Sequence, residues 1–398
     1  MTTEAVRLPL AERALAARVL AVPPSGIRRF FDILATMDDV ISLGVGEPDF
    51  DTPERIVAAG VRSLHAGRTH YTSNYGTIEL RRALAAHLEQ RYDVAYDPAT
   101  ELLITVGASE AVDLALRATC DPGDEVILHE PSYVAYVPAI VFAGGVVRHV
   151  PTRLEDDFAL DPAAVEAAIT PRTKALFLGY PCNPTGAVLP DDVQDALADI
   201  ARRHDLLVYS DEIYDRLAYG TYRHRAFSAL PGMRERTILM GGFSKAYAMT
   251  GWRVGYLAAP AAILEGIVKI HQYGIMSAPT TAQDAALVAL TTGEADVERM
   301  RAEYDRRRRL LVDGLNRLGL RTFEPRGAFY AFPQITSTAF DSDTFAQRLL
   351  EEERVAVVPG SAFGPSGEGH VRACYATAYE QLEEALVRIG RFVERHRA

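Results

Sequence analysis

Short runs of β-branched and aliphatic residues alternate with amphipathic helical stretches through the middle of this chain. This order is the strongest constraint on the fold, because strands that alternate with helices predict a mainly parallel, doubly wound sheet covered by helices. The runs predicted as strands span residues 102–106, 125–129, 146–150, 175–178, 206–209 and 237–240. We therefore expect an α/β fold whose large domain covers residues 46–290.

The sequence pattern changes after about residue 290, where strands become short and one long charged helix appears. The predicted elements are a helix at 294–318, strands at 328–332, 355–358 and 370–375, and an amphipathic helix from residue 379. This pattern predicts a smaller α+β domain over residues 291–398. We expect the N-terminal segment, residues 1–45, to pack with this smaller domain.

The 398-residue chain carries a formal net charge of −11, which argues against a general binder of nucleic acid or acidic membranes. Its most basic run, Arg306 to Arg309, has acidic neighbours and helical periodicity. Such a run is typical of a solvated helix face. We expect these four guanidinium groups to face water.

The three cysteines, Cys120, Cys182 and Cys374, are dispersed and lack the spacing of metal ligands. Packed, reduced thiols and no metal site are therefore expected. The first residues lack the apolar core of a signal peptide, and no segment has the uninterrupted apolar length of a membrane span. These features predict a soluble cytoplasmic protein.

Chemically distinctive residues follow the predicted strands at their carboxyl ends, where open α/β sheets bind ligands. The segment Gly107, Ala108 and Ser109 lies between a strand and a helix, so free backbone N–H groups and the helix dipole would favour a phosphate there. The later strand ends are followed by an aromatic ring that opens the next helix, an amide, a carboxylate, a hydroxyl and an amine: Tyr133, Asn183, Asp211, Ser244 and Lys245. We expect these groups to share one site.

Each of these features also has an ordinary structural explanation. A Gly-Ala-Ser sequence before a helix is usually an N-cap, and Tyr133 alone is more often a core residue. Asn-Pro-Thr-Gly at 183–186 is a β-turn signature, and Asp-Glu-Ile-Tyr at 211–214 suits a helix start. Their joint occurrence at successive strand ends favours a binding site.

Lysine is scarce in this chain: of 42 basic residues only Lys174, Lys245 and Lys269 are lysines. Arginine supplies positive charge but cannot lose its proton near neutral pH or react covalently with an aldehyde, whereas a desolvated lysine amine can. Lys245, which is kept in Gly-Gly-Phe-Ser-Lys-Ala-Tyr-Ala-Met-Thr-Gly-Trp-Arg, is therefore the leading candidate for a covalent role.

With these motifs the chain resembles the class I/II aminotransferases, pyridoxal-phosphate enzymes of fold type I. The resemblance runs from Leu-Gly-Val-Gly-Glu-Pro-Asp-Phe at 43–50 to Val-Arg-Ala-Cys-Tyr-Ala-Thr at 371–377. Its most specific part is Ser-Lys-Ala-Tyr-Ala-Met-Thr-Gly-Trp-Arg-Val-Gly-Tyr at 244–256. The resemblance implies a mainly parallel seven-stranded sheet flanked by helices, a smaller α+β domain, pyridoxal 5′-phosphate as cofactor and a homodimer with shared active sites.

The resemblance also implies roles for single residues. Lys245 matches the lysine that carries the cofactor and later moves a proton between the substrate Cα and the cofactor C4′. Asp211 matches the carboxylate paired with the pyridine nitrogen. Asn183 and Tyr214 match the donors to the ring 3′-oxygen, with Asn183 also at the substrate, and Tyr133 matches the ring stacked on the cofactor.

The remaining matched positions concern the phosphate and the substrate carboxylate. The positions expected at the phosphate are Ala108, Ser109, Ser244 and Arg253, beside Gly107. Tyr71 matches the tyrosine that reaches the phosphate of the neighbouring subunit. Arg372 matches the arginine that grips the substrate α-carboxylate, near the backbone of Gly44. One departure is Gly242, where some relatives carry a further phosphate-binding serine.

The activity implied by the resemblance is transfer of the amino group of an L-amino acid to a 2-oxo acid such as 2-oxoglutarate, by a ping-pong mechanism. Segments 39–50, 357–364 and 375–386 are most similar to prokaryotic aromatic amino-acid aminotransferases, so we expect aromatic donors. Aspartate or alanine aminotransferases of the same family and a pyridoxal-phosphate-dependent β-lyase are the alternatives. A non-catalytic regulator would carry an N-terminal DNA-binding module, which is not expected because the resemblance begins within the first few dozen residues.

Overall fold

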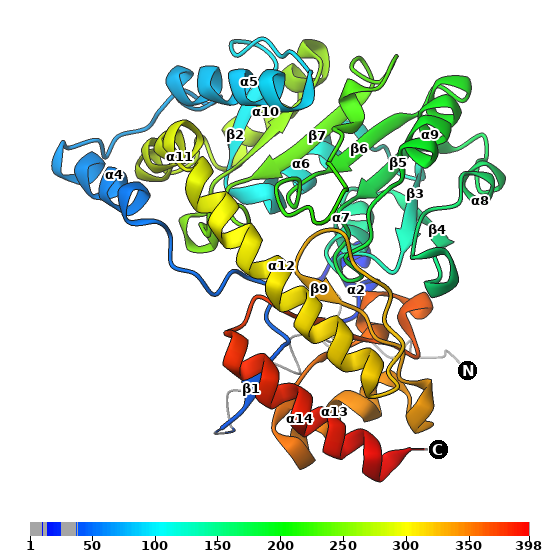
Figure 1. Cartoon of the computed structure of the whole chain (residues 1–398). Helices are drawn as coiled ribbons and strands as arrows, with labels where there is room; N and C mark the ends of the chain where they lie inside the picture. The colour runs from blue at the N-terminus through cyan, green and yellow to red at the C-terminus, as the bar shows by residue number, and fades with distance from the viewer. Residues whose placement is uncertain (1–9, 11–13, 25–36, 38, 398) are drawn as a thin grey trace.

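The computed structural model describes residues 10, 14–24, 37 and 39–397, and its larger part is built on a seven-stranded sheet (Figure 1). The strands are β2 (Leu102–Thr105), β3 (Glu125–Glu130), β4 (Val146–Pro151), β5 (Thr173–Gly179), β6 (Leu207–Asp211), β7 (Thr237–Gly242) and β8 (Gly255–Ala258). They lie in the order β2-β8-β7-β6-β5-β3-β4. Only β8 runs antiparallel to its neighbours β2 and β7. The predicted mainly parallel seven-stranded sheet is confirmed.

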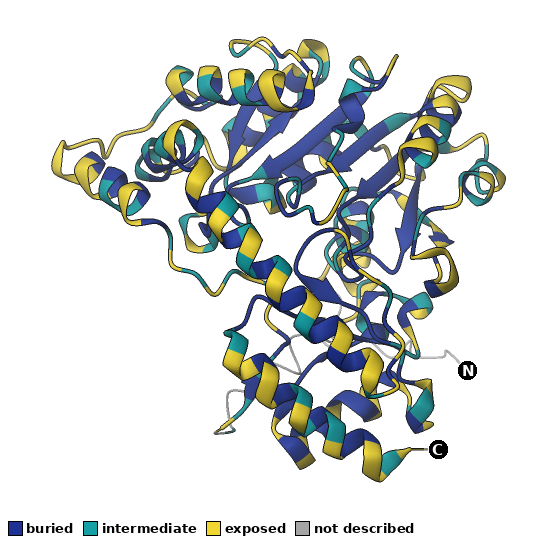
Figure 2. Cartoon of the chain, viewed as in Figure 1, coloured by how far each residue is buried: buried dark blue, intermediate teal, exposed yellow. Residues whose placement is uncertain are grey.

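Helices cover both faces of this sheet. One face carries α6 (Gly107–Thr119), α7 (Tyr136–Phe142) and α10 (Ala261–Gly274). The other carries α8 (Pro162–Ala167), α9 (Asp191–Arg203), α5 (Ile78–Tyr92) and α11 (Thr280–Thr292), and α4 (Glu54–His65) packs on α11. Successive strand residues such as Val126 and Ile127 pack into these opposite layers. Every residue of β3 is therefore buried, and Figure 2 shows the sheet buried beneath helices whose outer faces are exposed.

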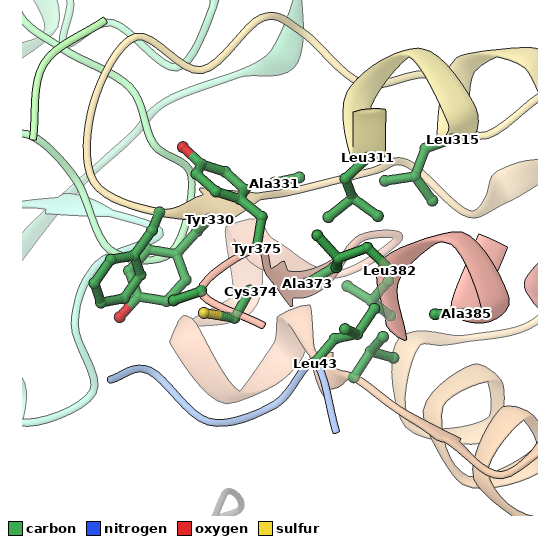
Figure 3. Packing of buried hydrophobic residues seen from close by; sticks show 14 of the residues in the cluster. Leu43, Leu311, Leu315, Tyr330, Ala331, Ala373, Cys374, Tyr375, Leu382 and Ala385 are labelled. Atoms are coloured by element: carbon green, nitrogen blue, oxygen red, sulfur yellow. The ribbon is translucent and has the colours of Figure 1, made fainter. Parts of the chain in front are cut away.

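Residues 294–397 form a smaller α+β layer joined to the sheet by the long helix α12 (Glu294–Arg317) (Figure 1), whereas α2 (Ala17–Leu20) contacts α7. It contains α13 (Ser342–Glu353), α14 (Tyr379–His396), β9 (Tyr330–Ala331), β10 (Val355–Ala356), β11 (Val358–Pro359) and β12 (Val371–Cys374). Strands β11, β12 and β9 form an antiparallel sheet. Figure 3 shows Leu311 and Leu315 of α12 gathered with Ala373 of β12 and Leu382 of α14 in one apolar core.

The end of the N-terminal segment joins this smaller layer through β1 (Ile41–Ser42), which pairs in parallel with β10. Ile41 and Leu43 are buried in the same apolar core. Residues 1–9, 11–13, 25–36 and 38 of the predicted segment lie outside the described part of the chain. The domain boundaries at residues 45 and 290 stay predictions.

Several predicted elements differ in their limits. Tyr133 does not open the helix after β3: it lies in the preceding turn, and its carbonyl accepts the N–H of Tyr136, where α7 begins. The predicted strand 355–358 is two strands with different partners, β10 and β11. The side chain of Asp161 caps the start of α8 by accepting the N–H of Ala163.

The prediction of a solvated face at Arg306 to Arg309 is wrong for two of the four residues. The side chains of Arg307 and Arg308 are only 8% and 4% exposed. Arg307 pairs with Asp49, and Arg308 pairs with Asp305. Acidic neighbours in the sequence do not by themselves indicate an exposed helix face. Such carboxylates, together with more distant ones, can pair with a guanidinium and so allow its burial.

All three cysteines are buried and free, as predicted for packed thiols. Within the described residues, no helix combines the length and apolar character needed to cross a membrane. The same residues contain no cluster of three or more potential side-chain ligands for a metal ion.

Candidate active site

A cavity of about 560 Å³ opens at the carboxyl ends of β5, β6 and β7, beside the start of α6. Eleven residues predicted for the site line it: Gly44, Ala108, Ser109, Tyr133, Asn183, Asp211, Tyr214, Ser244, Lys245, Arg253 and Arg372. They come from segments far apart in the chain, as expected for groups at the ends of parallel strands. The structure thus brings the predicted amine, carboxylate, amide, aromatic ring and arginines together.

Lys245 lies in the turn after β7 and reaches into this cavity. Its Nζ donates a 2.6 Å hydrogen bond to the backbone carbonyl of Gly46. Burial lowers the pKa of Lys245 to about 8, and the positive charges of Arg372 and Arg253 act in the same direction. A substantial fraction of this amine is therefore neutral close to physiological pH.

Asp211 is the last residue of β6 and is buried. Its Oδ2 accepts a 2.8 Å hydrogen bond from the hydroxyl of Tyr136, and its Oδ1 accepts one of 3.1 Å from the N–H of Ile213. Burial raises the pKa of Asp211 to about 6, and although the charge of Lys245 acts weakly against this rise, no ion pair within 4.0 Å joins Asp211 to a cation among the described residues. A protonated ring nitrogen entering the cavity would supply the missing positive partner.

The turn between β2 and α6 forms a cradle for an anion. Gly107 has φ +76°, and a Cβ there would lie 2.8 Å from Nη2 of Arg253. Gly255 of β8 supports the turn from behind, since its Cβ would lie 2.7 Å from the backbone nitrogen of Ala108. Arg253 itself has φ +53°, an uncommon conformation for a residue other than glycine. Such a backbone is typical of functional sites, and here it sets a guanidinium against the turn.

Arg372 on β12 closes the opposite side of the cavity. Its Nη1 donates to Oδ1 of Asn183 at 2.9 Å, and its Nη2 donates to the carbonyl of Gly44 at 2.7 Å. The guanidinium lies 4.6 Å from the ring centre of Tyr330 and 5.0 Å from that of Phe363. Its Nε is buried without a hydrogen-bond partner in the described part of the chain, and each Nη nitrogen keeps a second N–H group that could donate to a ligand.

Two tyrosines of the site were not predicted. Tyr136 holds Asp211, and the Tyr330 hydroxyl lies 2.7 Å from the hydroxyl of Tyr214. Both line the cavity. Tyr136 follows Tyr133 by three residues in Tyr-Val-Ala-Tyr, and Tyr330 lies in an apolar strand, so each fits the sequence pattern of a core residue.

Two predicted residues do not line the cavity. Gly107 is buried directly behind it, against Arg253. Tyr71 lies away from it, with 80% of its surface exposed, among residues around the start of α5. Within the described residues the Tyr71 ring does not reach the phosphate turn, and its role toward a second subunit stays a prediction.

A buried amine, a buried carboxylate that lacks a cation and an anion cradle at the strand ends of this α/β fold define a pyridoxal-phosphate enzyme of fold type I. Residues 38–389 match the family "Aminotransferase class I and II". The aspartate aminotransferase of Pyrococcus abyssi is 47% identical and the aromatic-amino-acid aminotransferase 2 of Thermococcus litoralis 44% identical. The first match covers 94% of this chain and 97% of the Pyrococcus protein. The second covers 96% of this chain and 98% of the Thermococcus protein.

The crystal structure of an aromatic aminotransferase from Pyrococcus horikoshii matches with a TM-score of 0.88 and 47% identity. That match covers 92% of this chain and 99% of the solved one. The chain belongs to the class I and II aminotransferases. It is a transaminase, and its cofactor is pyridoxal 5′-phosphate.

Proposed function

We propose that this cavity is the active site of an aminotransferase acting on L-amino acids, with a preference for aromatic donors. The observation that carries the site assignment is the position of Lys245 and Asp211 in one buried cavity with Arg372. Amino transfer needs a base, a partner for the cofactor's ring nitrogen and a clamp for the substrate carboxylate. Lys245 offers an amine of lowered pKa, Asp211 an unpaired carboxylate and Arg372 an unsatisfied guanidinium donor.

The residues fit the cofactor's phosphate at the cradle between β2 and α6. The first N–H groups of α6 have no partner within the helix, and the helix dipole favours an anion there. Arg253 adds a positive charge, and Ser109 and Ser244 line the same cavity. Some relatives have a further phosphate-binding serine at the position of Gly242. The groups named here form the phosphate cradle without that hydroxyl.

The same cavity fits the cofactor's ring. The buried Asp211 carboxylate would hold the proton of the pyridine nitrogen by charge pairing, and Tyr133 would stack on the ring. Tyr214 and Asn183 would donate to the 3′-oxygen. When bound, the cofactor takes up the electron pair left at the substrate Cα.

Lys245 supplies the base in this proposal. Because burial lowers its pKa to about 8, the Nζ can accept the proton from the substrate Cα and return it at the cofactor C4′. Arg372 would grip the α-carboxylate, which a planar guanidinium matches better than an ammonium group. Its contacts to Asn183 and Gly44 fix its orientation, so the clamp also orients the Cα–H bond.

Aromatic donors are supported by the lining of the cavity and by the similarity of segments 39–50, 357–364 and 375–386 to aromatic aminotransferases. Val45, Tyr133 and Tyr330 offer apolar and aromatic surface beside the proposed carboxylate clamp. The 47% identical aspartate aminotransferase supports an acidic donor as the alternative. Comparing kcat/KM for phenylalanine, tyrosine, aspartate and alanine with 2-oxoglutarate decides between them. Clear superiority of aspartate or alanine would rule out the aromatic preference.

A β-lyase would use the same lysine and carboxylate. The two reactions differ in their need for a 2-oxo acid, so the test is release of pyruvate and ammonia without any acceptor. We expect amino transfer to exceed this release at least tenfold, roughly the difference that 1.4 kcal/mol of barrier makes. Equal or faster release would favour the lyase.

We further propose a homodimer in which Tyr71 completes the partner's phosphate site. Tyr71 and Tyr273 are 80% and 87% exposed, and Asn74 links their segments by donating to the carbonyl of Met276 at 2.8 Å. Mixing Tyr71→Phe subunits with Lys245→Ala subunits would create one intact site per hybrid dimer. We expect cofactor retention and activity to recover on mixing, whereas sites built from one chain would show no recovery.

A further inference from the structure

We propose that Glu110 and His271 form a positioning pair that holds the turn at residues 106–109 in the shape required by the cofactor phosphate. This inference rests on the phosphate cradle proposed above. It assigns a role to two residues outside the cavity lining, on helices α6 and α10.

The carboxylate of Glu110 connects the turn to α10. Its Oε2 accepts the backbone N–H of Val106 at 2.5 Å, and its Oε1 lies 2.8 Å from Nδ1 of His271. Val106 is the residue at which the strand gives way to α6. One side chain therefore ties the last residue before the cradle to a helix packed behind it.

His271 is placed to fix this carboxylate. Its side chain is fully buried in α10, and its Nε2 has no hydrogen-bond partner among the described residues. The contact to Glu110 is thus the ring's one side-chain hydrogen bond in that part of the chain. Glu110 in turn is held from both of its oxygens, which leaves its carboxylate little freedom to rotate.

The pair acts on the cradle through the backbone. Because the N–H of Val106 is taken by Glu110, the following N–H groups of Gly107, Ala108 and Ser109 are the ones left for an anion. Gly255 limits the turn from behind and Arg253 limits it at the side of Gly107. Glu110 and His271 supply the remaining restraint, without contacting the ligand.

This role predicts an effect on the phosphate group alone. The test compares retention of pyridoxal phosphate and of pyridoxal, which lacks the phosphate, by equilibrium dialysis of the full-length protein loaded with either compound. The variants are Glu110→Ala and His271→Leu. His271→Asn is the conservative variant, since its amide nitrogen can replace Nδ1 as donor. Asp113→Ala, in an exposed ion pair on the same helix, is the control.

We expect Glu110→Ala and His271→Leu to raise the Kd for pyridoxal phosphate roughly tenfold, the size set by losing a hydrogen bond to a charged group. The Kd for pyridoxal should stay within about twofold, and His271→Asn and Asp113→Ala should bind both compounds like the wild type. Should Glu110→Ala fail to fold, His271→Leu and its Asn counterpart carry the same comparison.

Equal weakening of both compounds would show a general structural role and overturn the proposal, as would unchanged binding in both variants. Failure of the cradle itself has a different signature. In that case the wild type would bind pyridoxal as tightly as pyridoxal phosphate, before any variant is compared.

Discussion

The hydroxyl of Tyr136 donates a 2.8 Å hydrogen bond to Oδ2 of Asp211, and both side chains are buried at the floor of the cavity. The bond fixes the carboxylate plane at the end of β6. It also favours the ionised carboxylate, against the burial that raises the pKa of Asp211 to about 6. Tyr136 is therefore a second determinant of the charge proposed to hold the cofactor's ring nitrogen.

Tyr136→Phe should raise the pKa of Asp211 further, because it removes a donor to the charged form. We expect kcat to fall about three- to tenfold near neutral pH, with the larger loss on the acid side, where more of the carboxylate is protonated. The measurement is kcat between pH 6 and pH 9. Tyr209→Phe is the control, because its buried hydroxyl bonds Thr119 away from the cavity. An unshifted acid limb in Tyr136→Phe would contradict this role.

Asp211→Asn should slow turnover severely yet stabilise the cofactor-free protein at neutral pH. The folded pKa of Asp211 is raised, so its contribution to stability is present below about pH 4 and is lost as the pH rises through about 6. Two pKa units correspond to about 3 kcal/mol, which Asp211→Asn should recover at pH 7 but not at pH 4. Urea unfolding at both pH values measures this. The control variant is Asp313→Asn, at an exposed aspartate. A stability difference between Asp211→Asn and the wild type that does not change with pH would refute the prediction.

Gly107→Ala should impair retention of the cofactor through contact as well as strain. Gly107 and Gly220 both have positive φ, so alanine costs about 1–2 kcal/mol at either position. Only at Gly107 would the new Cβ meet Arg253, at 2.8 Å from Nη2, whereas nothing lies within 4 Å at Gly220. We expect roughly tenfold weaker binding of pyridoxal phosphate in Gly107→Ala alone. Equal cofactor binding in the two variants would argue against the cradle.

The sheet and the main site groups were predictable because their signals are local. The parallel strands β3 and β5 each contain a continuous apolar run, and Lys245, Asp211 and Asn183 stand in short motifs that follow runs of this kind. β8 was not among the predicted runs, because it is only four residues long and its first two residues, Gly255 and Tyr256, belong to the motif that follows Lys245.

The unpredicted parts depend on partners far away in the chain. The hydroxyl of Tyr136 meets a residue 75 positions later, and Tyr214 and Tyr330 are 116 positions apart. Without those partners, a tyrosine in an apolar run has the pattern of a core residue. The burial of Arg307 is equally hidden, since its partner Asp49 lies 258 positions away.

Arg307→Ala should lower the free energy of unfolding by about 2–3 kcal/mol, because it leaves both carboxylate oxygens of Asp49 without the Nη1 donor that they share. The value is below that of a fully buried pair because Asp49 keeps 27% exposure. Arg309→Ala, at an arginine that is 66% exposed, should change stability by no more than about 0.5 kcal/mol. Urea unfolding of both variants measures the contrast. Equal changes would restore the solvated-face interpretation.

The scarcity of lysine allows a direct test of the central assignment, that Lys245 carries the cofactor. Borohydride reduction of the holoenzyme fixes the cofactor to the lysine that carries it, and peptide mass mapping then locates the label. The chain has only three lysine side chains to tell apart: Lys174, Lys245 and Lys269. We predict the pyridoxyl mass on the Lys245 peptide, and no labelled lysine and no turnover in Lys245→Arg, which keeps the charge but cannot form the bond. Label on Lys174 or Lys269 in the wild type, or turnover that survives in Lys245→Arg, would contradict the account.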